Sequence, residues 1–161
     1  MSVMNTVKDE NAMAELKFDF CKEQNNRLYS GGSIESEMLS MVKRGSVNWY
    51  EDGRWPVVYH FSPLRQNILN WYPFDRDGEL LEVGAGCGAL TGLFCDRVRH
   101  VTALELTEIR SRINYERHKD RDNLDIYICD IADFKLDKRF DYIIVNGVLE
   151  YAALMFKGNE P

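Results

Sequence analysis

Residues 80–92 of this 161-residue chain read LLEVGAGCGALTG, an apolar run that leads directly into closely spaced glycines. The apolar run is typical of a strand that is buried on both faces of a sheet. Gly84, Gly86 and Gly88 then remove every second Cβ where the chain must turn sharply. A backbone without these side chains lets a ligand lie close to the main chain, facing the N–H groups that open the next helix. The stretch therefore predicts a strand, a glycine turn and a helix that together hold a ligand.

The sequence after this stretch continues to alternate between strand and helix patterns. We expect strands near residues 79–84, 100–105, 125–129 and 140–145, and helices near 88–97, 107–118 and 148–156. Such alternation predicts right-handed crossovers and a parallel sheet, and hence an α/β fold. The second and third strands lead into carboxylates, Glu105 and Asp130. Acidic groups from neighbouring strands are thus expected around the glycine turn.

The first 60 residues carry weaker patterns. We expect an amphipathic helix over about 9–29, a second helix over 33–45 that Ser33 caps, and a hairpin turn at Asp52-Gly53. Ser62-Pro63 is a good helix start, with Ser as the N-cap. The charge-rich segment 110–121 is interpreted as a solvated helix face.

An aromatic stretch precedes the predicted α/β region, and two interpretations of it stay open. Its rings either form a lid over the ligand or pack the N-terminal helices onto the core. The residues concerned are Trp49, Tyr50, Trp55, Tyr59, His60 and Phe61.

Composition excludes several classes of protein. The formal net charge of −6 argues against a large nucleic-acid surface. No apolar run approaches the roughly 20 residues of a membrane span, and the first 30 residues lack an apolar signal core, so we expect a cytoplasmic protein. The four cysteines, at positions 21, 87, 95 and 129, have no C-x-x-C spacing. They predict buried free thiols rather than a metal site or a disulfide framework.

Taken together, the glycine turn, Glu82, Glu105, Asp130 and the block FDYIIVNGVLE at 140–150 resemble the nucleotide-binding half of class I S-adenosylmethionine-dependent methyltransferases. The resemblance covers about residues 60–156. It implies a Rossmann-like sheet with strand order 3-2-1-4 for the portion present, a domain over 61–161, and a helical N-terminal extension over 1–60. Many members of the family have His where this chain has Tyr151.

The family usually has seven strands, in the order 3-2-1-4-5-7-6, whereas four are predicted here. We therefore expect the chain to be a truncated form or the front part of a longer polypeptide. The open edge of the fourth strand is expected to continue with further chain or to associate with a second copy.

The resemblance also implies a role for each matching residue. Glu82 would hold the methionyl amino group, Glu105 both ribose hydroxyls, and Asp130 the adenine amino group beside the backbone of Ile131. The full set of implied cofactor-binding residues is Glu82, Gly84, Ala85, Gly86, Gly88, Glu105, Leu106, Asp130, Ile131 and Asn146. At strand ends, Glu105 and Asp130 have an alternative role as caps of the following helices.

The resemblance implies methyl transfer to a small molecule or a saccharide precursor. A hydroxyl acceptor would need a base, and His60, Tyr59 and Glu150 are the candidates. No metal is expected.

Three alternatives stay open. Gly84-x-Gly86-x-x-Ala89 also fits a nicotinamide-dinucleotide fingerprint. An RNA adenine dimethyltransferase shares the GALT and VTALE segments, but follows its fourth strand with Asn-Leu-Pro-Tyr where this chain has Asn146-Gly-Val-Leu. Finally, the half-fold could be a non-catalytic docking module.

Overall fold

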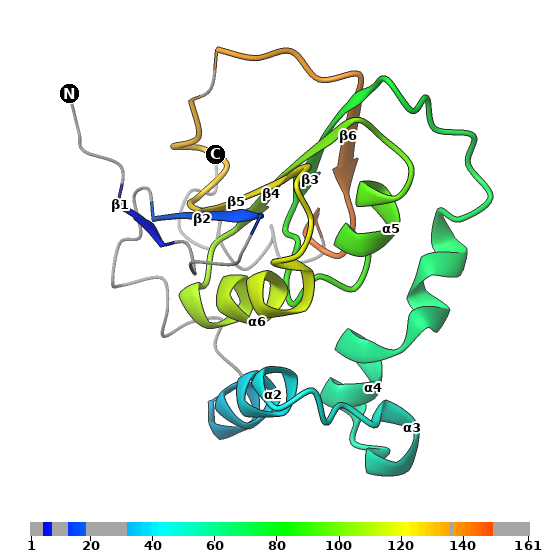
Figure 1. Cartoon of the computed structure of the whole chain (residues 1–161), viewed down its shortest axis with the longest axis vertical. Coiled ribbons are helices and arrows are strands. Elements are labelled where there is room, and N and C mark those ends of the chain that lie inside the picture. Colours follow the sequence, from blue (N-terminus) through cyan, green and yellow to red (C-terminus); the bar gives the residue numbers. More distant parts are fainter. Residues whose placement is uncertain (1–4, 8–12, 19–31, 136, 150–161) are drawn as a thin grey trace, which may run out of the picture.

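The computed structural model describes residues 5–7, 13–18, 32–135 and 137–149, and Figure 1 shows their arrangement. These residues contain a six-stranded sheet with the order β1-β2-β5-β4-β3-β6. All neighbouring strands are parallel except β1 and β2, which pair antiparallel. The strands are β1 (Asn5–Val7), β2 (Glu15–Phe18), β3 (Glu79–Val83), β4 (His100–Glu105), β5 (Leu124–Ile128) and β6 (Tyr142–Val145). The predicted α/β class is confirmed, and the four predicted strands occur as β5-β4-β3-β6, in the expected order 3-2-1-4.

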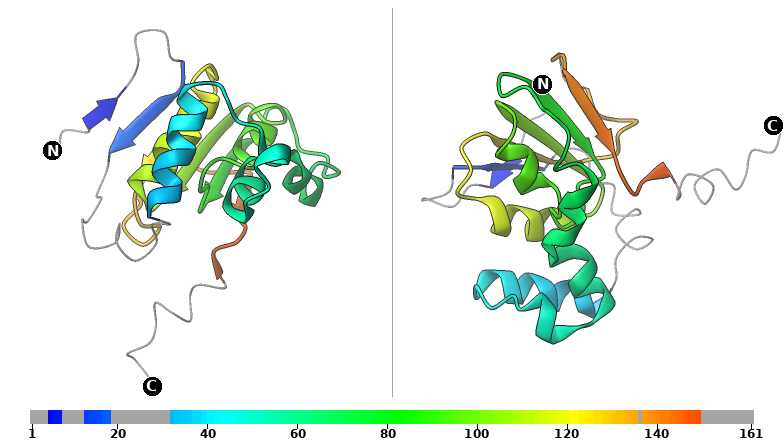
Figure 2. Two further views of the ribbon diagram at one scale, coloured as in Figure 1. Left: turned by 90° about the horizontal axis from the view of Figure 1, so that it is seen from below. Right: turned by 90° about the vertical axis from the view of Figure 1, so that its right-hand side faces the viewer.

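The helices of the described residues lie in layers on one side of the sheet. Helices α5 and α6 pack against the strands, and α2 lies on the far side of α6 from the sheet (Figure 1 and Figure 2). The helices are α2 (Ser33–Lys43), α3 (Trp49–Asp52), α4 (Trp55–Phe61), the 3₁₀ helix η1 (Pro63–Ile68), α5 (Thr91–Cys95) and α6 (Glu108–His118). This layering places α6 between the sheet and the N-terminal helices.

The strand that opens the glycine turn is buried on both faces, as predicted. Leu80 joins the core cluster that β3, β4 and β5 share with Phe94 of α5 and Tyr115 of α6. Its neighbour Leu81 points the other way, into a second cluster with Phe134. Apolar residues on both faces thus suit β3 to an interior position, between β4 and β6.

The predicted helix over 9–29 is wrong where the structure describes it. Residues 15–18 form β2, which runs parallel to β5. Leu16 is buried, whereas Lys17 on the opposite face bonds Asp125 at 3.0 Å. Strand β2 is short, and its partner strand lies more than 100 residues away. The hydrophobic periodicity of the local sequence therefore could not predict it. The division of the chain at residue 60 stays a prediction, although part of the expected extension lies in the sheet.

The predicted hairpin at Asp52-Gly53 is also wrong, because this region forms α3 and α4. Gly53 does adopt the left-handed conformation expected of a turn glycine (φ 65°), but there it ends a helix. Pro56 lies in the first turn of α4, where its missing N–H costs nothing.

The remaining helix predictions hold with changed ends. The N-cap of α2 is Gly32 and not Ser33, and α5 spans only part of the predicted 88–97. The helix start at Ser62-Pro63 is confirmed, since the Ser62 hydroxyl accepts a hydrogen bond from the Leu64 N–H at 3.2 Å, but the helix is a 3₁₀ helix. The predicted helix over 148–156 lies almost wholly outside the described residues.

A buried ion pair joins α2 to α6. The Arg110 guanidinium donates to the Glu35 carboxylate at 2.7 Å, and Glu35 is buried. We expect Arg110→Ala to lower the free energy of unfolding by about 3 kcal/mol, because it leaves a buried carboxylate without its cation.

Arg112→Ala is the matched control for this prediction. Arg112 lies on the same helix and pairs with the partly exposed Glu108 at i,i+4. Its loss is expected to cost about 0.5 kcal/mol. Equal losses for the two variants in urea unfolding would contradict the assignment of the Glu35 pair as the anchor of α2.

Candidate functional site

The candidate site lies at the carboxyl ends of β3, β4 and β5, where the glycine turn begins. Gly84, Gly86 and Gly88 all adopt positive φ values, 74°, 56° and 77°. The N–H groups of Gly84 and Ala85 both donate to the Leu104 carbonyl at 2.9 Å. These bonds fix the turn to the end of β4, so that its path is set before any ligand binds.

The three glycines of the turn meet different surroundings. A Cβ at Gly84 would lie 2.2 Å from the Val148 side chain, and one at Gly88 would lie 2.2 Å from Asn114 Oδ1. At Gly86 the nearest atom would be His60 Cε1 at 4.0 Å. Gly84 and Gly88 therefore make room for protein side chains. This differs from the expectation that all three would make room for a ligand, because only the space beside Gly86 is free of such an overlap.

Glu105 organises the turn through its carboxylate and is only 7% exposed. One oxygen accepts the Gly86 N–H at 2.9 Å, and the other accepts the N–H and the hydroxyl of Thr107, both at 2.9 Å. Thr107 is the N-cap residue of α6. The carboxylate thus joins the glycine turn to the start of α6, so the alternative role of Glu105 at the helix start has a physical basis. Since a carboxylate has about four acceptor positions, at least one remains for a further donor.

Glu82 is 5% exposed and accepts a hydrogen bond from the Thr91 hydroxyl at 2.7 Å. The pKa of Glu82 is raised to about 8, chiefly by burial and also by the nearby Glu105 charge, while the Thr91 hydrogen bond opposes the rise. At neutral pH the carboxyl group therefore retains its proton until a cation approaches it.

The third predicted acidic residue lies in a more open position. Asp130 is half-buried and accepts the Ala132 N–H at 2.9 Å in a local turn. Ile131 beside it is exposed. Leu106 and Asn146 are half-buried. The adenine side of the predicted site is therefore accessible to solvent.

Among the candidate bases, His60 lies beside the glycine turn, since its Cε1 would be 4.0 Å from a Cβ at Gly86. Burial lowers the pKa of His60 to about 4, and the positive charges of Arg110, Arg65 and Arg117 contribute. Tyr59 stacks edge-on against His60, with ring centroids 5.0 Å apart. Glu150 and Tyr151 lie outside the described residues.

The residues of the aromatic stretch differ in their surroundings, and only some of them pack onto the core. Phe61 packs into a cluster with Met38, Cys87 and Ile113, which attaches α4 to α2 and α6. Tyr50 and Trp55, in contrast, are 80% and 72% exposed. Packing onto the core accounts for the end of the stretch, and the lid interpretation stays a prediction.

Several residues of the site were missed because the segment 110–121 was interpreted as a solvated helix face, which is wrong. Arg117 points inward and donates to the backbone carbonyls of His60 and Cys87, at 2.9 and 2.5 Å. It therefore fastens the end of α4 to the glycine turn. Asn114 and His118 are also buried. Their only sequence signal is their i,i+4 spacing, which places them on one helix face.

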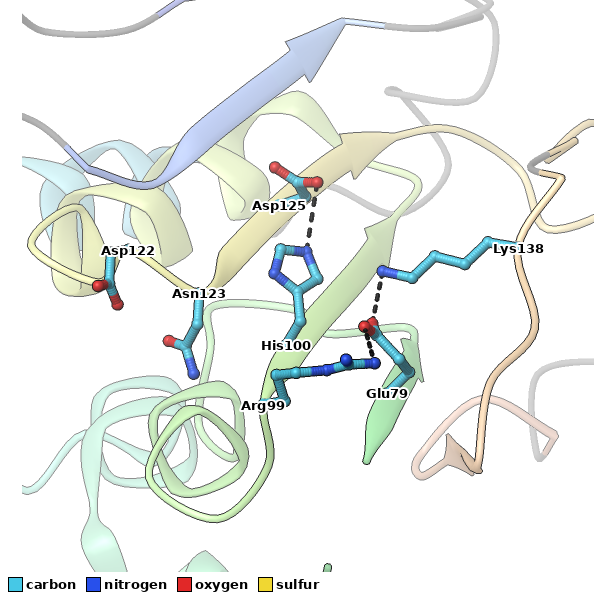
Figure 3. A pocket seen from close by; sticks show the side chains of 7 residues that line it. All are labelled: Glu79, Arg99, His100, Asp122, Asn123, Asp125 and Lys138. Carbon is cyan, nitrogen blue, oxygen red and sulfur yellow. Dashed lines mark ion pairs between the residues drawn. The ribbon is translucent and has the colours of Figure 1, made fainter. Parts of the chain in front are cut away.

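An open depression of about 700 Å³ lies at the opposite edge of the sheet (Figure 3). It is lined by Glu79, Arg99, His100, Asp122, Asn123, Asp125 and Lys138. Several of its polar groups pair with one another, for example Arg99 with Glu79 at 2.8 Å and His100 with Asp125 at 3.4 Å. Since β3, β4 and β5 begin here, this depression is separate from the glycine turn.

Among the described residues, no group of three or more His, Cys, Asp or Glu side chains could hold a metal ion. Cys87 and Cys95 are buried free thiols, as predicted, Cys129 is buried as well, and Cys21 lies outside the described residues. None of the helices in the described part of the chain is long and apolar enough to cross a membrane.

Comparisons with known proteins agree with this geometry. A protein of Staphylococcus carnosus named "Uncharacterized methyltransferase" is 33% identical over 79 residues, which are 49% of this chain and 36% of that protein. A Papaver bracteatum protein named "Probable (S)-tetrahydroprotoberberine N-methyltransferase 2" is 27% identical over 85 residues, 50% of this chain and 24% of that protein. The chain thus matches about a third or less of the length of these curated relatives.

A solved structure shares the fold. It is a Methanococcus maripaludis protein described as a candidate S-adenosyl-L-methionine-dependent methyltransferase, with a TM-score of 0.50 and 17% identity over 73% of this chain and 50% of that chain. The family model described as nodulation protein S (NodS) matches residues 64–156, more than half of the chain and the whole of the described site from η1 onward. This chain therefore belongs to the NodS family and has the fold of class I S-adenosylmethionine-dependent methyltransferases.

Proposed function

We propose that this chain binds S-adenosylmethionine at the glycine turn and provides the cofactor-binding part of a methyltransferase. The observation that carries the proposal is a pair of buried carboxylates at the glycine turn: Glu82, two residues before Gly84, and Glu105, which accepts the Gly86 N–H. A buried carboxylate with a raised pKa favours a cationic partner, and the methionyl ammonium is one. The residues present therefore fit the cofactor.

Each part of the cofactor has a matching group in this chain. Glu82 would hold the ammonium, Glu105 the ribose hydroxyls and Asp130 the adenine amino group, with the Ile131 backbone at the ring edge. The turn from Gly84 to Gly88, with Ala85, would lie along the methionine tail, while Leu106 and Asn146 would complete the walls.

When bound, S-adenosylmethionine supplies an activated methyl group on a sulfonium leaving group. The protein's task is then to align the acceptor and to exclude water. His60 is neutral at pH 7, since its pKa is about 4, and it lies next to Gly86. It would accept a hydrogen bond from a hydroxyl acceptor there, and Tyr59 and Glu150 stay the other candidate bases.

For the acceptor we propose a small molecule or a saccharide precursor. The net charge of −6 supports this class over RNA. One relative carries an N-methyltransferase name that specifies a small molecule, which supports the same class. We further propose that the exposed apolar side chains of β6, Ile143 and Val145, are covered by further chain or by a second copy.

Equilibrium dialysis with methyl-labelled S-adenosylmethionine tests the proposal. We expect retention of one equivalent per chain, displaced by S-adenosylhomocysteine and not by a single-stranded RNA oligonucleotide. No retention at millimolar donor would contradict the proposal. Displacement by RNA would favour the RNA alternative.

Binding of S-adenosylhomocysteine is also expected to release close to one proton per chain at pH 7. Glu82 is protonated below its pKa of about 8, and pairing with the ligand ammonium requires the ionised form. Affinity should therefore rise with pH up to about 8 and then level off. Calorimetry in two buffers with different ionisation enthalpies measures the released proton.

Glu82→Gln is the control for the proton release, because the amide does not titrate in this range. The variant should bind more weakly and release no proton. An enthalpy that does not depend on the buffer in the unmodified protein would contradict the assignment of Glu82 to the ammonium.

A further inference from the structure

A line of buried hydrogen bonds runs from α6 to the Glu82 carboxylate. Asn114 Nδ2 donates to the Thr91 hydroxyl oxygen at 3.1 Å, and that hydroxyl donates to Glu82 Oε2 at 2.7 Å. Behind Asn114, His118 Nδ1 lies 2.9 Å from Asn114 Oδ1 and 3.1 Å from the Asn114 carbonyl oxygen. All four residues are buried.

The direction of every bond in this line follows from its neighbours. Both oxygens near His118 Nδ1 are acceptors, so this nitrogen carries the proton. The pKa of His118 is lowered to about 4, chiefly by burial and secondly by Arg117, so the ring is neutral at pH 7 and Nδ1–H is its proton. The proton on each donor therefore points toward Glu82, and such chains of donors polarise one another.

The glycines around the turn make room for this line. A Cβ at Gly88 would lie 2.2 Å from Asn114 Oδ1, and a Cβ at Gly92 would lie 2.8 Å from His118 Nε2. Gly88 and Gly92 are four residues apart, as are Asn114 and His118. Gly88 and Gly92 of the turn and α5 thus lie against Asn114 and His118 of α6.

We infer that Thr91, Asn114 and His118 are positioning residues that orient the Glu82 carboxylate and favour its ionised form for an ammonium group. This inference rests on the proposed function. None of the three needs to contact the ligand, because each acts through the next. The line explains how a carboxylate in an apolar strand is kept available for a cation, since the Thr91 hydroxyl opposes the effect of burial.

The inference predicts a selective loss of affinity. Thr91→Val keeps the shape of the side chain and removes the donor. We expect about tenfold weaker binding of S-adenosylhomocysteine, the effect of losing one hydrogen bond to a charged group. The compound 5′-methylthioadenosine has the adenosine and the sulfur but no amino-acid tail. Its affinity should change less than about twofold, because the effects of independent sites add to within about that factor.

Two further variants complete the calorimetric experiment. Thr91→Ser restores the donor and should restore the affinity for S-adenosylhomocysteine. Asn114→Asp keeps the size of the side chain and removes the N–H donor to Thr91. It should give the same selective loss of affinity for S-adenosylhomocysteine, even where Thr91→Val does not fold.

The outcomes are distinguishable. Equal weakening of the two ligands in Thr91→Val and Asn114→Asp, or no weakening of either, would overturn the inference. Failure of the unmodified protein to bind either ligand would overturn the proposed function itself.

Discussion

Glu105→Ala is expected to weaken the binding of S-adenosylhomocysteine about 100-fold. The ribose would donate to the acceptor position left on the Glu105 carboxylate, and a hydrogen bond to a charged group contributes up to about 3 kcal/mol. The variant also removes the acceptor of the Gly86 N–H and of Thr107, so the free energy of unfolding should fall by about 2 kcal/mol. Calorimetric titration below the unfolding temperature measures the affinity.

A ligand comparison separates contact with the ribose from support of the turn. An analogue that lacks the ribose 2′-hydroxyl should bind the unmodified protein about tenfold more weakly than S-adenosylhomocysteine. In Glu105→Ala the two ligands should bind equally, because the partner of that hydroxyl is gone. Continued discrimination in the variant would return Glu105 to a purely structural role at the start of α6.

Gly88→Ala is expected to lower the free energy of unfolding by about 4 kcal/mol. The new methyl group would lie 2.2 Å from Asn114 Oδ1 and 2.9 Å from His118 Cε1, in a fully packed region. The positive φ of 77° adds the cost of a left-handed conformation. Urea unfolding followed by circular dichroism measures the change.

Gly86→Ala is the matched control, two residues away in the same turn and also at positive φ (56°). Its methyl group would meet only His60 Cε1, at 4.0 Å, so the loss should stay near 1 kcal/mol. This variant should nevertheless lose most of its affinity for S-adenosylhomocysteine, because the methyl group would occupy the space proposed for the ligand. Equal stability losses in the two variants would contradict the different surroundings assigned to these glycines.

The strongest sequence signals proved to be local ones. The apolar run before Gly84 and the acidic residues at 105 and 130 could be interpreted from consecutive positions, and they located strands β3, β4 and β5; the order of the strands, also confirmed, followed from the resemblance to the methyltransferase family. Strand β2 could not be predicted in this way, because it is short and pairs with β5, which lies more than 100 residues later in the chain. The hairpin predicted at Gly53 was wrong for a related reason, because a glycine in the left-handed conformation can end a helix as well as form a hairpin turn.

The polar interior of the site was harder to predict than its edge. Arg117, Asn114 and His118 lie in a charge-rich segment of the kind usually found on a solvated helix face. Arg117 bonds the end of α4, and Asn114 and His118 lie against the segment 88–92, so their environment depends on segments that are not adjacent in the sequence. Only the matching four-residue spacing of Gly88 with Gly92 and of Asn114 with His118 could have indicated that the two segments fit together.

Side-by-side calorimetric titration of the unmodified chain with S-adenosylhomocysteine and NAD tests most directly whether the turn between Glu82 and Glu105 holds an adenosyl amino acid. We predict saturable binding of one S-adenosylhomocysteine per chain and no detectable heat from NAD. Binding of NAD without binding of S-adenosylhomocysteine would contradict the assignment of the site.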